Sequence, residues 1–338
     1  MTDLSATGLE HISELEEPIV PNADADADAE GLAVVSKSPT QLAFRRFLRH
    51  RLAVACLGIL VLLTLMVVFA PLTARYSEIE QVTDDSGAIL RNVSPRWDAW
   101  FGTDDIGRDL YARIIWGGRV SMFIGIAVAF FSAIIGTAVG ALAGWRGGRV
   151  DDALMRVTDI FLAFPLLVAL LVMRNLFAEI TWLRWLFGDL SSPRFIVVLL
   201  SLVGWMLVAR LVRGTILSLK EREFVEAARA LGATDRKIIM RHLIPNSLGP
   251  IIVAMTTTVA VAIITESTLS FFGYGPNPAE GRSSWGNLLR EADGAITTGR
   301  EWKAIFPGLT LVLVVLCVNF VGDGLRDAFD PKQRRTSG

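Results

Sequence analysis

The sequence predicts an all-α polytopic membrane protein with six transmembrane helices. Hydrophobic residues make up 52% of the 338 positions, and the mean hydropathy is positive. The apolar residues gather in runs of about 20, the length a helix needs to cross a hydrocarbon core of ~30 Å. Arg and Lys gather at alternate ends of these runs, as the positive-inside rule describes. An ordinary soluble domain is therefore excluded.

Residues 1–38 form an acidic segment without aromatic residues, and an Asp-Ala repeat occupies 24–30. Such a segment buries too little apolar surface to offset the entropy of ordering. We therefore expect a disordered cytoplasmic tail, which we favour over an acidic metal-binding tail. The first apolar run starts too late to be cleaved as a signal peptide.

The first spanning helix is expected at Leu52–Pro71. The basic residues that flank its start outnumber the single Arg75 just beyond its end, which places the N-terminus in the cytoplasm. Residues 39–118 then comprise this uncleaved anchor helix and an extracytoplasmic segment, 72–118. The flanking residues are Arg45, Arg46, Arg49 and Arg51.

Within that segment, Phe101–Asp109 predicts a turn followed by the start of an interfacial helix. Thr103 or Asp104 can cap it, and its apolar stripe is Ile106, Leu110 and Ile114. The neighbouring aspartates 104, 105 and 109 also permit a cation site. Helix caps explain them more simply, so we favour caps.

The second span is expected at Val120–Ala143, within a permease transmembrane domain covering 119–325. Gly136, Gly140 and Gly144 recur every four residues and predict a groove where another helix packs closely. That helix can belong to this chain or to another subunit.

The third span is expected at Val157–Leu176, where Pro165 removes one backbone hydrogen bond. We favour a fixed bend there over a hinge. Residues 177–193 then form an outer interfacial loop, with Trp182 and Trp185 at headgroup depth.

The remaining spans are expected at Phe195–Val212, Ile251–Phe272 and Ala304–Val321, with a second outer loop at 273–304. Six spans place both termini in the cytoplasm, the C-terminus as a basic tail over 326–338. Glu266 lies inside the fifth span and is a candidate intramembrane polar site. Because it lies near the outer end, we favour hydrogen bonding between helices over substrate contact.

Cys56 and Cys317 both lie in apolar runs, which favours buried small side chains over a disulfide. The Cys and His spacing matches no metal motif, and no cofactor is expected.

A polar, helix-prone stretch, 221–250, separates the fourth and fifth apolar runs. It cannot cross a bilayer, because each of its charges costs roughly 3 kcal/mol at the membrane centre. The small side chains of Ala227 and Ala228 let another protein approach the helix backbone closely. The alternative is an amphipathic connector that rests on lipid headgroups.

Two short helices are expected in this stretch. In the first, Phe224, Ala227, Ala228 and Leu231 recur at helical spacing, and Gly232 supplies the stop. The second runs from a Thr234 cap to about His242, and Pro245 ends it.

Glu226-Ala227-Ala228, Gly232 and Pro245 resemble the EAA signature of ABC-importer permeases. That pattern is EAA, three residues, Gly, nine residues, then I-x-L-P. His242 and Ile244 depart from it at the Ile and Leu positions. The resemblance implies that Glu226, Ala227, Ala228, Leu231, Gly232 and Pro245 belong to a coupling loop that docks on a cytoplasmic ATPase subunit.

Further stretches resemble the C-type permease subunit of dipeptide, oligopeptide and nickel importers over about residues 40–331. The resemblance implies a type I ABC importer permease fold in the inner membrane lipid bilayer. It also implies a homologous second permease, two cytoplasmic ATPases and an extracytoplasmic binding protein, with no nucleic acid. The similar stretches are 101–109, 159–165, 269–273, 284–286 and 322–327.

The leading hypothesis is thus a permease subunit of an ATP-driven importer, with peptides as substrate and nickel or another chelate as the alternative. The chain has no G-x-x-x-x-G-K-[ST] phosphate loop, so ATP hydrolysis is expected in partner subunits. A self-sufficient, ion-coupled secondary transporter would need ionisable residues near the midplane, and only Glu266 comes close. An intramembrane enzyme is not favoured either, because it would need catalytic groups inside the spans and the three histidines of this chain lie outside them.

Overall fold

The computed structural model is helical and describes residues 39–278 and 281–329. The predicted acidic tail 1–38 and the last nine residues, 330–338, lie outside this part. Within it there are no strands, only isolated bridges between residues 81 and 109. Five helices are long and apolar enough to cross a membrane: α3 (Arg51–Val68), α5 (Leu110–Arg146), α9 (Pro193–Lys220), α13 (Leu248–Phe271) and α15 (Trp302–Phe329).

The expected third span is two helices, α6 (Gly148–Ala163) and α7 (Leu166–Ala178), which meet at an angle of 101°. Pro165 lacks an N–H and disfavours helical backbone in the residue before it, and Phe164 is accordingly extended (ψ 141°). The six-helix fold class is confirmed when this pair counts as one broken span. The predicted bend at Pro165 is present, but it divides the span into two helices.

Helix α5 is longer than expected and has no separate interfacial helix before it. Its N-cap is Asp109, whose Oδ2 accepts a hydrogen bond from the Ala112 N–H at 2.8 Å. The predicted caps Thr103 and Asp104 therefore do not start a helix. Leu110 and Ile114 are buried as expected, but Ile106 is exposed.

The glycine groove of α5 is filled by α9 of the same chain. A Cβ built at Gly136 would lie 2.7 Å from the carbonyl oxygen of Trp205, and one at Gly144 would lie 2.9 Å from that of Arg213. At Gly140 the Cβ would overlap the Ala209 carbonyl oxygen. Small residues thus let the two backbones touch, and the groove is an intrachain seam.

Two more helices flank α3: α2 (Pro39–Arg49) before it and α4 (Ala70–Thr73) after it. Phe47 of α2 packs with Cys56 of α3 and Cys317 of α15, and both cysteines are free and buried. Helix α15 continues through the expected tail motif 322–327. Gly322 and Gly324 there lie against α13 and α3, which explains the small residues.

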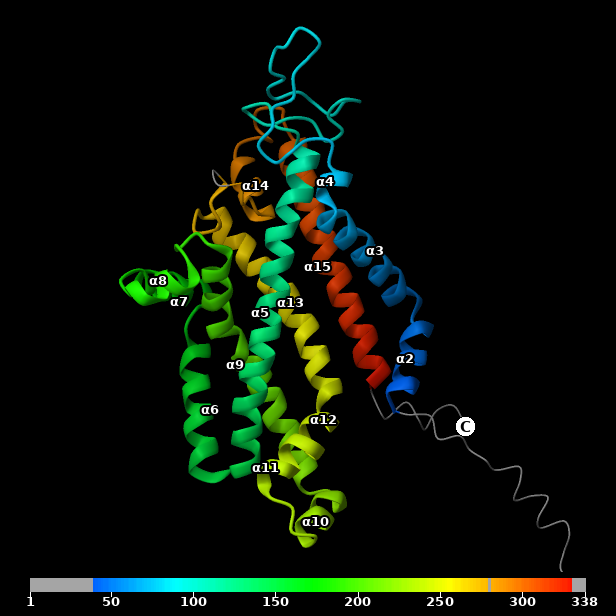
Figure 1. Ribbon diagram of the computed structural model, residues 1–338, viewed down its shortest axis with the longest axis vertical. Coiled ribbons are helices and arrows are strands. Elements are labelled where there is room, and N and C mark those ends of the chain that lie inside the picture. The colour runs from blue at the N-terminus through cyan, green and yellow to red at the C-terminus, as the bar shows by residue number, and fades with distance from the viewer. Residues whose placement is uncertain (1–38, 279–280, 330–338) are drawn as a thin grey trace, which may run out of the picture. The chain divides into compact units, whose positions relative to one another are not determined.

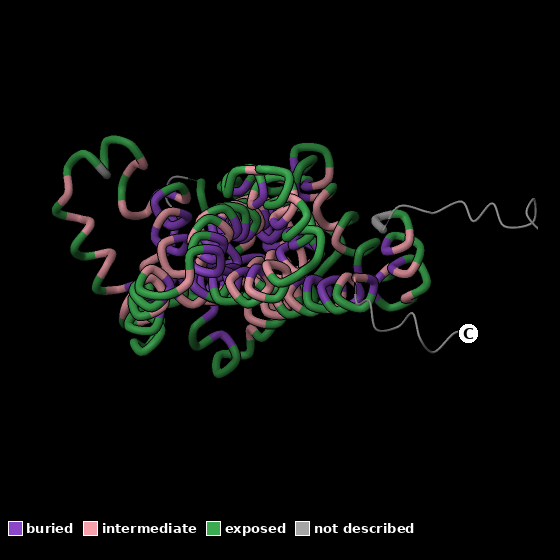
Figure 2. Tube along the Cα trace, turned by 90° about the horizontal axis from the view of Figure 1, so that it is seen from below, coloured by how far each residue is buried: buried purple, intermediate pink, exposed green. Residues whose placement is uncertain are grey.

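Short helices cover the two ends of the bundle (Figure 1). In that view α10 (Glu223–Ala230), α11 (Asp235–Ile238) and α12 (Ile244–Asn246) lie at the lower end, called here the α10 end. The α14 end carries α14 (Trp285–Glu291) and the segment 74–109. Helix α8 (Thr181–Phe187) lies beside α7, and its Trp182 and Trp185 are exposed. Figure 2 shows buried residues gathered along the middle of the bundle.

Candidate functional site

The α10 end begins with a helix whose C-terminus is set by backbone geometry. Gly232 has φ +76° and lies one residue beyond the C-cap Leu231. The Ala233 N–H donates to the Ala228 carbonyl and the Gly232 N–H donates to the Arg229 carbonyl. This pair of bonds defines a Schellman motif, whose left-handed residue favours glycine. The predicted stop at Gly232 is confirmed.

Helix α10 is anchored on the bundle through one face. Val225 is fully buried in a cluster with Ile216 of α9, Ile238 of α11 and Leu243, and Ala228 packs against that cluster. The predicted stripe is only partly right, because Phe224, Ala227 and Leu231 face outward instead.

Trp145 at the end of α5 joins α10 to the spanning helices. The Arg229 guanidinium lies 4.8 Å from the Trp145 ring centroid, a cation–π distance. Lys220 Nζ donates to the Trp145 carbonyl oxygen at 2.6 Å. The ring itself is buried. Nothing in the spacing of the motif pointed to Trp145; its position as the last large apolar residue before Arg146 was the only signal.

The exposed surface of the segment 221–241, which includes α10, combines apolar and charged side chains. Leu231 is 88% exposed, and Met240 is 60% exposed. All nine charged residues between 221 and 241 are exposed. None of them has an ion-pair partner in the part of the chain that the structure describes. Such a surface suits a protein partner, and of the predicted docking residues only Ala228 is half-buried; Glu226, Ala227, Leu231, Gly232 and Pro245 are exposed.

The path from α10 to α13 differs from the expected second helix. Thr234 precedes α11 but forms no side-chain cap, and a π-helical turn follows at Ile239–Leu243. Pro245 lies in the first turn of α12, where its missing N–H costs nothing, so it starts a helical turn and does not end one. His242 packs near the Phe224 ring, with centroids 6.5 Å apart.

Glu266 lies in a fully buried polar cluster near the α14 end. Its Oε2 accepts a hydrogen bond from Ser121 Oγ of α5 at 3.0 Å, and its Oε1 accepts one from Ser270 Oγ at 2.5 Å. Ser121 Oγ also accepts from the Trp285 N–H of α14 at 3.2 Å. Glu266 thus joins three helices through hydrogen bonds. These contacts are the hydrogen bonds between helices that the sequence analysis favoured over a substrate contact.

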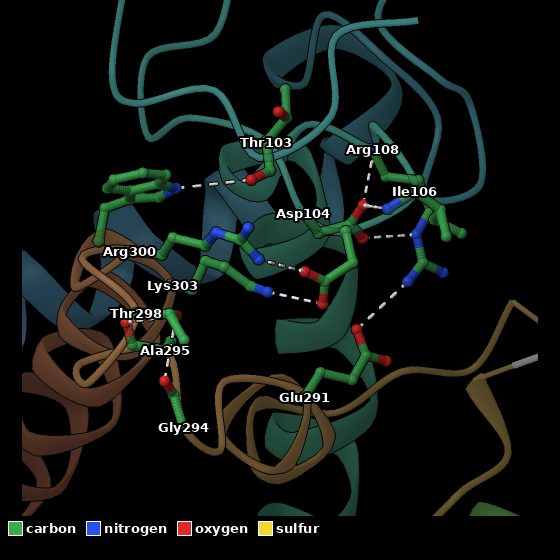
Figure 3. A network of polar contacts seen from close by, with 12 residues as sticks. Thr103, Asp104, Ile106, Arg108, Glu291, Gly294, Ala295, Thr298, Arg300 and Lys303 are labelled. Carbon is green, nitrogen blue, oxygen red and sulfur yellow. Dashed lines mark hydrogen bonds and ion pairs between the residues drawn. The ribbon is translucent and has the colours of Figure 1, made fainter.

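A network of ion pairs fixes the segment 74–109 on the bundle (Figure 3). Arg108 connects the Asp104 carboxylate, at 2.7 Å, with Glu291 of α14, at 3.2 Å. Arg113 of α5, only 1% exposed, joins the same two acids at 2.9 and 2.5 Å. The four charges therefore neutralise one another, with Asp104 and Arg113 buried and Glu291 partly exposed.

The other two aspartates of the predicted turn have separate roles. Burial raises the pKa of Asp105, but Lys303, bound at 2.7 Å, and then Asn92 and Arg300 outweigh it and hold that pKa below its usual value. Burial raises the pKa of Asp109 to about 6, against the opposing hydrogen bond from Ala112 and the charge of Arg75. Among the described residues no group of three acids, histidines or cysteines gathers as a metal site.

The chain matches two protein families. Residues 136–335 match the family described as "Binding-protein-dependent transport system inner membrane component". Residues 38–95 match the "N-terminal TM domain of oligopeptide transport permease C".

Similar proteins cover nearly the whole chain. The "Oligopeptide transport system permease protein OppC" of Bacillus subtilis is 40% identical over 94% of this chain and 97% of its own length. The "Dipeptide transport system permease protein DppC" of Bacillus subtilis is 36% identical over 95% and 94%. The Escherichia coli OppC is 38% identical over 90% and 95%.

A solved structure shares the fold. It is an inward-facing conformation of the MetNI methionine ABC transporter, superposed with a TM-score of 0.51 over 64% of this chain and 96% of that chain. Its sequence is 21% identical.

Proposed function

Because the chain belongs to the family of binding-protein-dependent transport system inner membrane components, we propose that it is a permease subunit of an ATP-driven importer of di- and oligopeptides. The names of its OppC and DppC relatives favour peptides over nickel or another chelate. The importer would further contain a second, homologous permease, two ATPase subunits and an extracytoplasmic binding protein.

We place the α10 end in the cytoplasm, together with both termini. The arginines before α3 and the basic residues of 220–241 support this orientation through the positive-inside rule. The α14 end then faces the extracytoplasmic binding protein, and a cytoplasmic ATPase can reach α10.

One observation carries the coupling role: α10 is held to the bundle by Val225, whereas no element in the described part of the chain covers Leu231 and Ala227 on its outward face. A groove on an ATPase subunit can enclose such a helix, with the apolar residues in the groove and the charged residues at its edges. Trp145, Arg229 and Lys220 then give the docked helix a direct connection to α5 and α9.

The proposed mechanism is a shift between two states. ATP binding draws the paired ATPases together, and the docked α10 helix carries that motion into α5 and α9, which switches the pathway from inward to outward facing. The ATPase can bias the equilibrium only through contacts that differ between the two states. The exposed surface of α10 supplies those contacts.

The test replaces Leu231 with Glu. Leu231 is 88% exposed, so the change leaves the core intact but buries a charge at the proposed interface, which we expect to weaken ATPase association at least about tenfold. Leu72→Glu is the matched control, because Leu72 of α4 is 84% exposed at the opposite end. Co-purification of the ATPase with each variant and peptide uptake by cells are measured.

If Leu231→Glu retains both ATPase association and uptake, the docking assignment is wrong. Uptake by the purified chain alone, driven by an ion gradient, would instead identify a secondary transporter.

A further inference from the structure

A polar cavity of about 450 Å³ lies at the α14 end, away from the α10 surface. Its walls come from four places in the chain: Arg174 of α7, Ser191 before α9, the loop 273–278 after α13, and Asn287, Arg290 and Glu291 of α14. The Asn287 side-chain amide donates to the Pro276 carbonyl at 2.8 Å and ties the loop to α14. The volume is that of a small-molecule site.

Arg174 brings an unsatisfied donor to this cavity. Its guanidinium carbon lies 5.1 Å from the ring centroid of Tyr274. Its Nε is buried and has no hydrogen-bond acceptor among the described residues. A buried N–H without an acceptor is unfavourable, so an anionic oxygen in the cavity would stabilise it.

Arg290 brings a second unpaired guanidinium. It lies close against the loop, since a Cβ built at Gly273 would be 2.8 Å from the Arg290 Cζ. In the described part of the chain Arg290 has no ion-pair partner. The neighbouring Glu291 does not form an ion pair with Arg290, because its carboxylate already binds Arg108 and Arg113.

The surroundings add positive charge. A second cavity, of about 600 Å³, shares Ser191 with the first and is lined by Arg119, Arg194 and Arg282 against the single acid Asp189. A concave surface lined mainly by one sign of charge concentrates ions of the opposite sign.

We propose that the cavity between Arg174 and Arg290 binds the free carboxylate of the transported peptide as it leaves the binding protein. This inference rests on the proposed function. The planar guanidinium donates two parallel hydrogen bonds to a carboxylate, and the cavity offers two such groups. Glycine and proline in the loop leave room for the adjoining peptide backbone. Lipid phosphate is the other source of an anionic group at this depth, and the test separates the two.

The test uses the complete importer in lipid vesicles, supplied with saturating binding protein and with either trialanine or its C-terminal amide. We expect Arg174→Gln and Arg290→Gln to lower trialanine uptake about tenfold or more, the loss of a charge-assisted hydrogen bond. Uptake of the amide should not change, so both variants lose the preference for trialanine over its amide. Arg290→Lys should retain part of this preference, because the positive charge remains.

The matched control is Arg91→Gln. Arg91 lies in the segment 74–109 at the same end, is exposed and lines neither cavity, so both uptakes should stay at the wild-type level. The amount of assembled complex and its ATPase activity are measured for every variant, which separates misfolding from lost recognition.

Unchanged trialanine uptake in both glutamine variants, or an equal fall for the acid and the amide, overturns the inference. Losses that appear only in vesicles containing phosphatidylglycerol show that the cavity holds a lipid phosphate, and the carboxylate assignment is then wrong. If the wild-type importer takes up neither peptide, the proposed function itself fails, which is a different result.

Discussion

The segment 221–241 at one end of the bundle and the α14 end hold their charges in opposite ways. At the α10 end the nine charged residues of 221–241 are exposed, and α10 rests on Val225. At the α14 end Arg113 and Asp104 are buried, and their ion pairs connect segments far apart in the sequence. The first arrangement leaves a surface free to bind and move, whereas the second fixes segment 74–109 and α14 on the spanning helices.

This difference has an energetic basis. A buried ion pair gains little over apolar packing, but removing one partner leaves an uncompensated charge and costs several kcal/mol. An exposed pair contributes roughly 0–1 kcal/mol, because water solvates both partners. Buried charges therefore lock the α14 end, and solvated charges leave the α10 end adaptable.

The largest effect is expected from Arg113→Met. It removes one of the two arginines that Asp104 and Glu291 share and leaves one uncompensated negative charge in the cluster, which should lower the free energy of unfolding by about 3–5 kcal/mol. Arg236→Met is the matched variant at the other end: Arg236 of α11 is exposed outside the spanning helices and has no ion-pair partner among the described residues, so the loss should stay below about 1 kcal/mol. Thermal unfolding of the purified chain in detergent measures both. Equal losses would remove the contrast between the ends.

The next effect concerns the α5–α9 seam, which carries the α10 end. Gly140→Ala places a methyl group against the Ala209 carbonyl and should destabilise the seam by about 1–3 kcal/mol. Amide hydrogen exchange should then rise in α10 more than in α14. Gly58→Ala in α3 is the control, because nothing lies within 4 Å of its added Cβ and helix propensity favours alanine. An equal rise in exchange in α10 and α14 would show that the seam does not stabilise the α10 end in particular.

The smallest effect is a pH dependence confined to the α14 end. The folded-state pKa of Asp109, about 6, lies above the unfolded value of about 3.9. Between these values the folded state holds a proton that the unfolded state has lost, so stability falls as pH rises from about 4 to 6. Wild type should therefore gain about 1 kcal/mol on going from pH 7 to pH 5, discounted for the solvent that reaches the site.

Asp109→Asn keeps an N-cap acceptor for Ala112 but cannot titrate, so this pH-dependent gain should disappear. Unfolding midpoints of the two proteins at pH 5 and pH 7 give the comparison. A gain of the same size in the Asn variant would assign the pH dependence to other groups.

Local sequence features predicted the spans well where the chain is apolar and uninterrupted. The length of the apolar runs was enough to predict α3, α9 and α13 as spanning helices. The position of Gly232 after α10 was enough to predict where that helix ends. The start of the second span was predicted at Val120, whereas α5 begins at Leu110 and includes the charged Arg113. Arg113 is buried because Glu291, 178 residues away, neutralises it.

The sequence by itself determined the membrane class, the family and the position of the α10 loop, because hydrophobic runs and the spacing of small residues act over short distances. Only the tertiary structure decided that α10 buries Val225 and exposes Leu231, that the chain turns by 101° at Pro165, and that Arg174 and Arg290 line one cavity. These features depend on partners from distant segments, and no local pattern of residues encodes which segments will meet.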